Sequence, residues 1–341
     1  MTAVSRRTGI IGTLGPISET RACIDGLVAA GLDTVRLSMS NGTRDRHRAT
    51  ARWVREIASE RARQVTLLAD LQGRKNRLGR FPDGGAEWAI GEQVHLTAEP
   101  GPLDTHRTWT TYPWDVDLTP AGAAVFIDDG AVVLSVQEVR HDELRCVVVN
   151  GGSVTDGRGV TLPGGTVYPP GLTDRDVEDL LFARDLGVEA VALSFAEQAE
   201  DYHAVRALAP DVAIIGKVES PAAMRQLPAL ADAFDGLMVA RGDLSLEIPF
   251  EDVPAAQEAV IDACIRRGKQ SMVATHVLHS MRVHVRPTPA EVADVAVAVR
   301  TGAGGLLLTG ETGYGRHPVH VVDVLRRLIE RAERDWPPVH R

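Results

Sequence analysis

The chain has 341 residues, of which 44% are hydrophobic and 24% charged, and its net charge at pH 7 is −9. This composition is typical of a globular protein and excludes disordered, collagen-like and coiled-coil chains, while the negative charge argues against nucleic acid as the main partner. Because the sequence has neither the roughly 18-residue apolar run of a membrane span nor an apolar signal core at its start, we expect a cytoplasmic protein without a membrane partner.

Short apolar runs alternate with helical patterns along most of the chain. The predicted strands cover residues 9–13, 34–38, 64–70, 190–194, 212–217, 236–240, 271–275 and 305–309. Helical patterns occupy, among other stretches, residues 18–30, 44–63, 174–185 and 202–209. Eight strands, each with a helix to follow, are the count of a (β/α)8 TIM barrel, so we predict an α/β fold of that kind.

The alternation breaks between about residues 76 and 160. There, turns rich in Gly, Pro, Asp and Thr separate short β-prone runs such as 93–96, 124–127 and 144–149. We predict an all-β domain, residues 76–159, inserted after the third strand of a barrel made of residues 1–75 and 160–341. An insertion at the C-terminal end of a barrel strand lies over the usual active-site mouth, so this domain is a candidate lid.

Lysine is scarce. Only three of the 37 basic residues are lysines, namely Lys75, Lys217 and Lys269. The simplest interpretation of the surplus of arginine is a G+C-rich genome. A lysine kept against that bias is a candidate for a role that needs a compact ammonium group, which the planar guanidinium of arginine cannot imitate.

Polar residues follow several predicted strands, where side chains point into a barrel mouth. Glu219 and Asp243 follow neighbouring strands and could hold one Mg²⁺ ion from two sides, together with substrate oxygens and water. Lys217 lies two residues before Glu219, so both side chains point to the same side of an extended segment. The alternative for Lys217 is a barrel ion pair without chemistry.

The turn after residues 236–240 has the pattern of an anion cradle. Gly242 lies where backbone N–H groups open a helical turn, which suits a carboxylate or phosphate, although a tight strand-to-helix turn explains the same residues. Thr275 ends another predicted strand and could donate a hydroxyl hydrogen bond. The pairs His276/His279 and His317/His320 lack a third ligand, so helix-surface histidines explain them better than a metal site does.

Together these stretches resemble the pyruvate kinase family, and the resemblance covers nearly the whole chain. The motifs that carry it lie at residues 11–16, 126–130, 162–164, 216–219, 238–244, 286–296 and 309–312. One departure is Pro289, where the family usually has an arginine. The family's architecture, a barrel with a small β domain after strand 3, agrees with the periodicity.

The resemblance implies a role for each matching residue. It implies that Lys217 stabilises the transferring phosphoryl group, that Arg36 holds the phosphate, and that Thr275 lies near the methylene carbon of the enolate. The divalent-metal ligands for Mg²⁺ or Mn²⁺ are implied to be Glu219 and Asp243. The implied seat of the substrate carboxylate is the backbone of Ala240, Gly242 and Asp243.

The resemblance also implies an altered monovalent-cation site. Many family members bind K⁺ with side chains that here correspond to Ser38, Ser40, Asp70 and Leu71, beside a glutamate that here is Lys75. An ammonium group can occupy the space of a potassium ion and supply its charge. We therefore expect K⁺ not to be required, as in the K⁺-independent branch of the family; the alternative is that Lys75 is a surface charge.

The nucleotide side departs further from the family. Arg77 matches an arginine that points at the nucleotide phosphates, Arg175 stands for a lysine, and Asn41 replaces a histidine. Tyr314 and His276 replace a lysine and a glutamine. The handling of phosphoenolpyruvate or pyruvate is therefore better supported than that of ADP or ATP.

The sequence thus predicts a pyruvate-kinase-like phosphotransferase that converts phosphoenolpyruvate and ADP to pyruvate and ATP. The alternatives are a phosphotransferase with a different acceptor in a specialised pathway, or a metal-dependent lyase or aldolase that uses a pyruvate enolate. A non-catalytic regulator would predict the loss of Lys217 or of a metal ligand, and neither is lost. We further expect the family's C-terminal regulatory domain to be missing and a homodimer to be possible.

Overall fold

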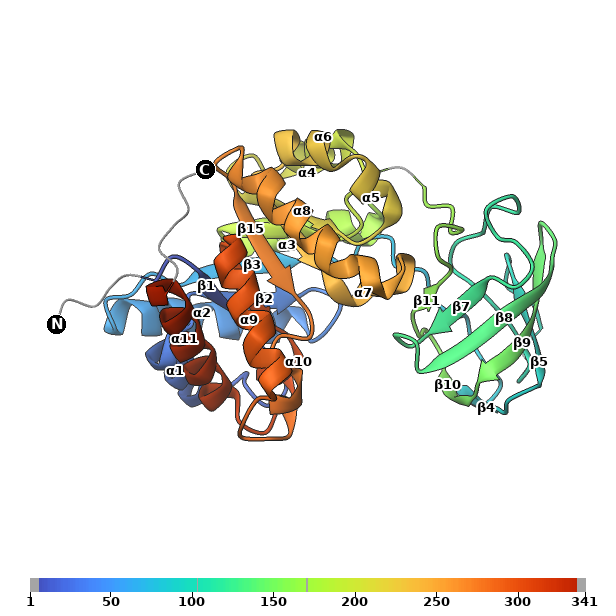
Figure 1. Cartoon of the computed structure of the whole chain (residues 1–341), viewed down its shortest axis with the longest axis horizontal. Helices are drawn as coiled ribbons and strands as arrows, with labels where there is room; N and C mark the ends of the chain where they lie inside the picture. Colours follow the sequence, from blue (N-terminus) through green and yellow to red (C-terminus); the bar gives the residue numbers. More distant parts are fainter. Residues whose placement is uncertain (1–5, 103, 170, 336–341) are drawn as a thin grey trace.

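The computed structural model describes residues 6–102, 104–169 and 171–335, and its centre is a closed barrel of eight parallel strands (Figure 1). These strands are β1 (Gly9–Thr13), β2 (Thr34–Ser38), β3 (Thr66–Asp70), β12 (Ala190–Leu193), β13 (Ala213–Val218), β14 (Gly236–Ala240), β15 (Gln270–Ala274) and β16 (Gly305–Leu308). They pair in the order β1-β16-β15-β14-β13-β12-β3-β2. The predicted barrel is confirmed, and every strand lies within two residues of its predicted bounds.

Helices surround the barrel. They are α1 (Arg21–Ala30), α2 (Arg44–Glu60), α3 (Asp174–Leu186), α4 (Ala199–Leu208), α5 (Pro221–Arg225), α6 (Leu227–Ala233), α7 (Arg241–Glu247), α8 (Val253–Ile265), α9 (Pro289–Thr301), α10 (Gly310–Gly313) and α11 (Pro318–Asp335), with 3₁₀ turns η1 (Phe250–Asp252) and η2 (His279–Arg282). Helix α1 begins later than predicted because Thr20 caps it, accepting the N–H of Cys23. Within the described residues, no helix has the length and apolarity to cross a membrane.

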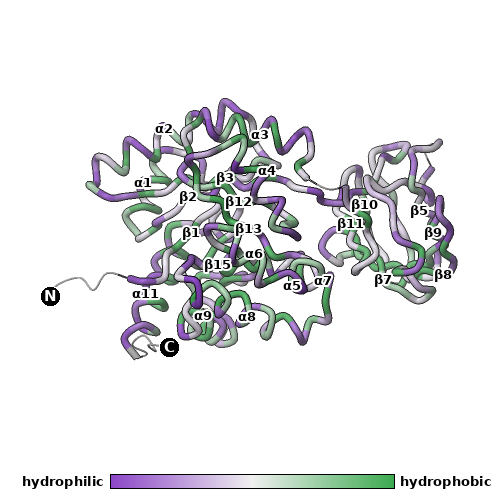
Figure 2. Tube along the Cα trace, turned by 90° about the horizontal axis from the view of Figure 1, so that it is seen from above, coloured by the Kyte–Doolittle hydropathy of each residue, from purple (hydrophilic) through white to green (hydrophobic). Residues whose placement is uncertain are grey.

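The barrel has an inner and an outer apolar layer. The inner layer fills the barrel with Ile11, Leu68, Ala190, Ala192, Ile215, Met238, Ala274 and Leu307. The outer layer lies between strands and helices and consists mainly of Leu, Ile, Val and Ala. In Figure 2 the barrel strands run as mostly hydrophobic stretches, whereas the helices alternate hydrophobic and hydrophilic residues. Aliphatic side chains therefore build this core, as expected for a sequence with few aromatic residues.

Between β3 and α3 the chain forms a separate group of strands, called the β unit below. It contains β4 (Gly85–Trp88), β5 (Gln93–Thr97), β6 (Arg107–Trp109), β7 (Ala124–Ile127), β8 (Val132–Val139), β9 (Glu143–Asn150), β10 (Gly152–Thr155) and β11 (Val160–Thr161). Six of them pair as β11-β7-β8-β9-β5-β6, and β10 pairs with β4. Figure 1 shows the β unit beside the barrel, next to α7. It has its own apolar core, which includes Trp88, Leu96 and Leu134.

Because the β unit and the barrel have separate cores, damage to one core should stay local. Leu134 is fully buried at the centre of the six-stranded sheet. We expect Leu134→Ala to lower the stability of the β unit by about 2–5 kcal/mol, the usual result of removing a buried leucine side chain. Hydrogen exchange should then accelerate across residues 85–161 and stay unchanged in the barrel strands.

The matched control is Val149→Ala on the neighbouring strand, because Val149 is 53% exposed. This change should alter stability by less than about 0.5 kcal/mol. Equal acceleration of exchange in the barrel of the Leu134→Ala variant would show that the two cores unfold together.

Candidate active site

Lys217, on β13, is held in the barrel mouth by three neighbours. Its Nζ lies 2.9 Å from Oε1 of Glu219 and 3.5 Å from Oδ1 of Asp70, and it donates a 2.8 Å hydrogen bond to the hydroxyl of Ser194. Burial alone would lower the pKa of Lys217, but these carboxylates outweigh burial and hold that pKa above its usual value. The ammonium group is therefore charged and fixed in place.

Arg36, on β2, lies beside the same carboxylate. Its Nε donates to Oδ2 of Asp70 at 2.6 Å, and its Nη1 donates to the hydroxyl of Thr13 at 3.0 Å. Burial of Asp70 acts to raise its pKa, yet Arg36 and Lys217 overcome this and hold the pKa below its usual value. One buried carboxylate thus positions two cations together, which creates a site for an anion.

Glu219 and Asp243 form an acidic pair. Burial and the nearby Asp243 raise the pKa of Glu219, although Lys217 opposes them. Burial likewise acts to raise the pKa of Asp243, but Lys75 and Lys217 outweigh it, so that pKa is below its usual value. Oε2 of Glu219 accepts the N–H of Phe195 at 2.7 Å, while Oε1 forms the ion pair with Nζ of Lys217 at 2.9 Å.

This pair fits a divalent ion. Besides burial, the charge of Asp243 raises the pKa of Glu219, so the two carboxylates lie close enough to repel each other, and a divalent cation between them would relieve that repulsion. Among the described residues no group of three Asp, Glu, His or Cys side chains could hold a metal. Two carboxylates suit Mg²⁺, which keeps several water or substrate oxygens in its shell.

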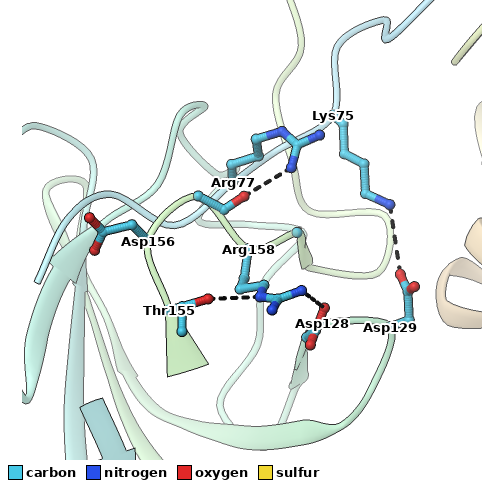
Figure 3. Close-up of a pocket in the computed structure, with 9 residues that line it drawn as sticks. Lys75, Arg77, Asp128, Asp129, Thr155, Asp156 and Arg158 are labelled. Atoms are coloured by element: carbon cyan, nitrogen blue, oxygen red, sulfur yellow. Dashed lines mark hydrogen bonds and ion pairs between the residues drawn. The ribbon is translucent and has the colours of Figure 1, made fainter. Parts of the chain in front are cut away.

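Lys75 pairs with one carboxylate of α7 and one of the β unit. Its Nζ is 2.9 Å from Oδ1 of Asp243 and 3.7 Å from Oδ1 of Asp129, in the β7–β8 turn of the β unit (Figure 3). Among the described residues it forms no hydrogen bond or ion pair with the expected partners Ser38, Ser40 and Asp70. Asp70 is already paired with two other cations.

Thr275 and the first turn of α7 pack closely. Thr275 has a φ of +73°, which is unusual for a β-branched residue, and its carbonyl accepts two hydrogen bonds from Arg241, at 3.0 and 2.7 Å. A Cβ at Gly242 would lie 2.8 Å from Cγ2 of Thr275, so only glycine fits there. Ala240 supplies no side-chain cap to this turn.

Arg77 contributes to a cavity formed by the β unit and the segment that follows β3. Its Nη1 donates to the carbonyl of Gly157 at 2.9 Å. Burial and the nearby charge of Arg175 lower the pKa of Arg77, so the two guanidinium groups lie near each other. Asn41 stays at the end of β2, where it donates to the hydroxyl of Ser38 at 3.1 Å. The cavity has a volume of about 350 Å³ and is lined by Lys75, Arg77, Asp128, Asp129, Thr155, Asp156, Gly157, Arg158 and Gly159 (Figure 3).

Sequence reasoning assigned no role to several side chains that build this site. The hydroxyl of Thr13 accepts a hydrogen bond from Arg36, and that of Ser194 accepts one from Lys217. Both residues lie at strand ends, where polar side chains face the mouth of a barrel. No sequence pattern indicated a role for Asp129, because its contact with Lys75 depends on where the β unit lies. His279 lies exposed on η2, as expected of a helix-surface histidine, and its Nδ1 is 3.3 Å from Oε1 of the buried Glu311, a contact that the sequence did not signal.

Fold and site together define an α/β-barrel enzyme with an anion site beside an acidic pair. The pyruvate kinase barrel-domain family model matches residues 5–322. The pyruvate kinase of Mycobacterium tuberculosis is 42% identical over 330 residues, which are 96% of this chain and 70% of that protein. The Corynebacterium glutamicum pyruvate kinase is 40% identical over 97% of this chain and 71% of its own length. The chain therefore belongs to the pyruvate kinase family of phosphotransferases.

One contact between the β unit and the barrel depends on pH. Glu247, the last residue of α7, accepts the N–H of Gly164 at 2.9 Å, just beyond β11. Burial raises the pKa of Glu247 to about 7, and the charges of Glu197 and Asp243 add to the effect. Because the folded-state pKa is raised, stability from this group is present at low pH and lost as the pH rises toward and through 7.

We therefore expect Glu247→Gln, which is neutral at every pH, to raise the melting temperature by a few degrees at pH 8 and to leave it unchanged at pH 4, below the unfolded-state pKa. Thermal melts across this range test the difference. The exposed neighbour Glu251 provides the control, because Glu251→Gln should show no such pH-dependent gain. A Glu247→Gln gain of equal size at both pH values would contradict the assignment.

Proposed function

We propose that this enzyme transfers the phosphoryl group of phosphoenolpyruvate to ADP and releases pyruvate and ATP, with Mg²⁺ or Mn²⁺ as cofactor. The observation that carries the proposal is the pairing of Arg36 and Lys217 on one buried carboxylate, beside the acidic pair Glu219 and Asp243. Relatives at 40–42% identity that are named pyruvate kinase support it.

Arg36 and Lys217 serve the phosphoryl group in this proposal. In phosphoryl transfer the transition state spreads negative charge over three equatorial oxygens, so catalysis depends on positioning and charge stabilisation. Both cations are fixed before substrate arrives, which avoids reorganisation during the reaction. Lys217 is 12% exposed and is already held by Glu219 and Ser194.

Glu219 and Asp243 would hold the metal ion. When bound, the ion would neutralise charge on the oxygens of the donor and of the transferring group. The raised pKa of Glu219, caused by burial and by the neighbouring charge of Asp243, supports this assignment because the two carboxylates lie close together. The carboxylate of phosphoenolpyruvate would lie on the backbone of Ala240, Gly242 and Asp243, next to Thr275.

ADP would bind on the side where the β unit meets the barrel. Arg77 and Arg175 supply positive charge for its phosphates, and Asn41 lies at the neighbouring end of β2. The β unit would act as a lid, since it reaches the mouth through Asp129 and touches α7 through Gly164.

K⁺ independence is also part of the proposal. The ammonium group of Lys75 lies 2.9 Å from Oδ1 of Asp243. The protein therefore supplies a positive charge there without binding an ion. Although Lys75 does not contact Ser38, Ser40 or Asp70 among the described residues, it raises the positive charge of the same mouth. A monovalent cation would then be redundant.

A coupled assay of pyruvate release with phosphoenolpyruvate, Mg²⁺ and ADP tests the function. We expect turnover by the natural enzyme and a loss of at least about 100-fold in kcat for Lys217→Met, because the lysine stabilises developing charge. Lys269→Met is the matched control and should keep kcat, since Lys269 donates to the carbonyls of Asp232 and Phe234, before β14, and not to a residue of the barrel mouth that the structure describes. Binding of phosphoenolpyruvate without turnover on ADP would point to another acceptor or to enolate carbon chemistry.

The same assay tests K⁺ independence when KCl is exchanged for a tetramethylammonium salt at equal ionic strength. The natural enzyme should show equal kcat in both salts. Lys75→Met should lose roughly 10-fold or more in activity without K⁺, because the mouth then lacks one positive charge, and should regain part of it with K⁺. An enzyme that is inactive without K⁺ would contradict the role of Lys75.

A further inference from the structure

This inference rests on the proposed function and concerns what keeps Lys217 and Glu219 in position. Both residues lie at the end of β13, and both contact residues 194–197, which join β12 to α4 and are called the 194–197 turn below. The hydroxyl of Ser194 accepts a hydrogen bond from Lys217 at 2.8 Å. The N–H of Phe195 donates to Oε2 of Glu219 at 2.7 Å. Whatever fixes this turn therefore fixes the ammonium group and the carboxylate together.

The 194–197 turn has one more contact with the same segment, and its backbone is strained. Oε1 of Glu197 accepts a hydrogen bond from the hydroxyl of Ser220 at 2.6 Å. Phe195 has a φ of +53°, a left-handed conformation that is unusual for a bulky side chain. Such a conformation persists only where the surrounding structure holds it. The turn therefore needs support from outside itself.

Arg74 supplies that support. It lies between β3 and the β unit and is 5% exposed, less than any other arginine among the described residues. Its Nη2 donates to the carbonyl of Phe195 at 2.6 Å, and its Nη1 donates to the carbonyl of Pro169 at 2.9 Å. Pro169 belongs to the segment that returns from the β unit to α3. One guanidinium group thus joins the 194–197 turn to both segments that connect the β unit with the barrel.

The surroundings of Arg74 suit a guanidinium group. Its Nη2 lies 3.6 Å from Oδ2 of Asp201 and 4.0 Å from Oε2 of Glu197, so its buried charge is balanced. The Tyr168 ring lies over the guanidinium, with 5.9 Å from Cζ to the ring centroid, and packs against the Phe195 ring at 5.5 Å. A planar group that donates in two directions and stacks on an aromatic ring is a property of arginine, and lysine shares only its charge.

We propose that Arg74 is a positioning residue that holds the 194–197 turn in place. Through the turn it keeps Glu219 oriented toward the metal ion and Lys217 toward the phosphoryl group. Arg74 acts on the turn rather than on the substrate. Groups that orient a metal ligand from behind change metal affinity or activity by about 10- to 100-fold when they are lost. Loss of Arg74 should therefore weaken metal binding and slow phosphoryl transfer.

Binding of Mn²⁺ without substrates tests this role, because it reports on Glu219 in the absence of turnover. Electron paramagnetic resonance of free Mn²⁺ gives the dissociation constant, and Glu219→Gln identifies the site. We expect Arg74→Met to raise that constant and to lower kcat, each by about 10-fold. Arg74→Lys keeps the charge that faces Asp201, so it should fold. Its ammonium group lacks the fork that holds both carbonyls, so it should change both quantities in the same direction.

Arg55→Met is the matched control. Arg55 also donates to two main-chain carbonyls, those of Leu186 and Gly187, at 2.6 and 2.7 Å. These carbonyls lie at the end of α3, where the chain enters β12 at the face opposite the mouth. The Arg55→Met variant should bind Mn²⁺ and turn over as the natural enzyme does.

Thermal melts separate a positioning role from a structural one. If Arg74 only stabilised the fold, Arg74→Met would melt at a lower temperature, while the folded variant would bind Mn²⁺ and turn over as the natural enzyme does. That result would overturn the inference alone. A natural enzyme that binds Mn²⁺ without turnover of phosphoenolpyruvate and ADP would instead overturn the proposed function. The Mn²⁺ dissociation constant of Arg74→Met would still decide whether Arg74 positions Glu219.

Discussion

The site depends on the burial of one carboxylate, that of Asp70. Taking a carboxylate out of water costs several kcal/mol unless cations compensate it, and here Arg36 at 2.6 Å and Lys217 at 3.5 Å do so. The dependence is mutual, because without Asp70 the two cations would repel each other in a buried mouth. The charge arrangement that suits a phosphoryl group is therefore also the arrangement that lets the barrel interior tolerate these side chains.

The chain segment after Asp70 links this pairing to the β unit. Gly73 has a φ of +67°, and a Cβ there would lie 2.6 Å from Cβ of Ser194, the residue whose hydroxyl accepts from Lys217. The N–H of Gly73 donates to Asp176 at 2.9 Å, inside the capping box of α3. The turn that leads toward the β unit is thus packed against the residue that positions Lys217. A shift of this turn would disturb both.

Much of the barrel was predictable because each strand is a short apolar run. Candidate site residues could be named because polar residues at the ends of parallel strands face one mouth of a barrel. The partner of Lys75 was not predictable, since it depends on how a long side chain leaves the turn at Gly73 and on which carboxylates lie within reach. The contact between His279 and Glu311 joins η2 to α10 across 32 positions, and no sequence spacing signals it. Strands as short as β6 and β11 have too few residues to show a period.

Charge balance in the mouth explains why Lys75 matters without contacting the predicted cation site. Arg36, Lys75 and Lys217 oppose Asp70, Glu219 and Asp243, three positive charges against three negative. A divalent ion on the acidic pair would add two positive charges, which then favour a substrate carrying a phosphate and a carboxylate, so metal and substrate should strengthen each other's binding. With a neutral side chain in place of Lys75 the mouth would carry a net negative charge, and a monovalent cation could restore the balance. In the proposal, the net charge of the mouth, rather than the exact position of the ammonium group, is what would make K⁺ unnecessary when Lys75 is present.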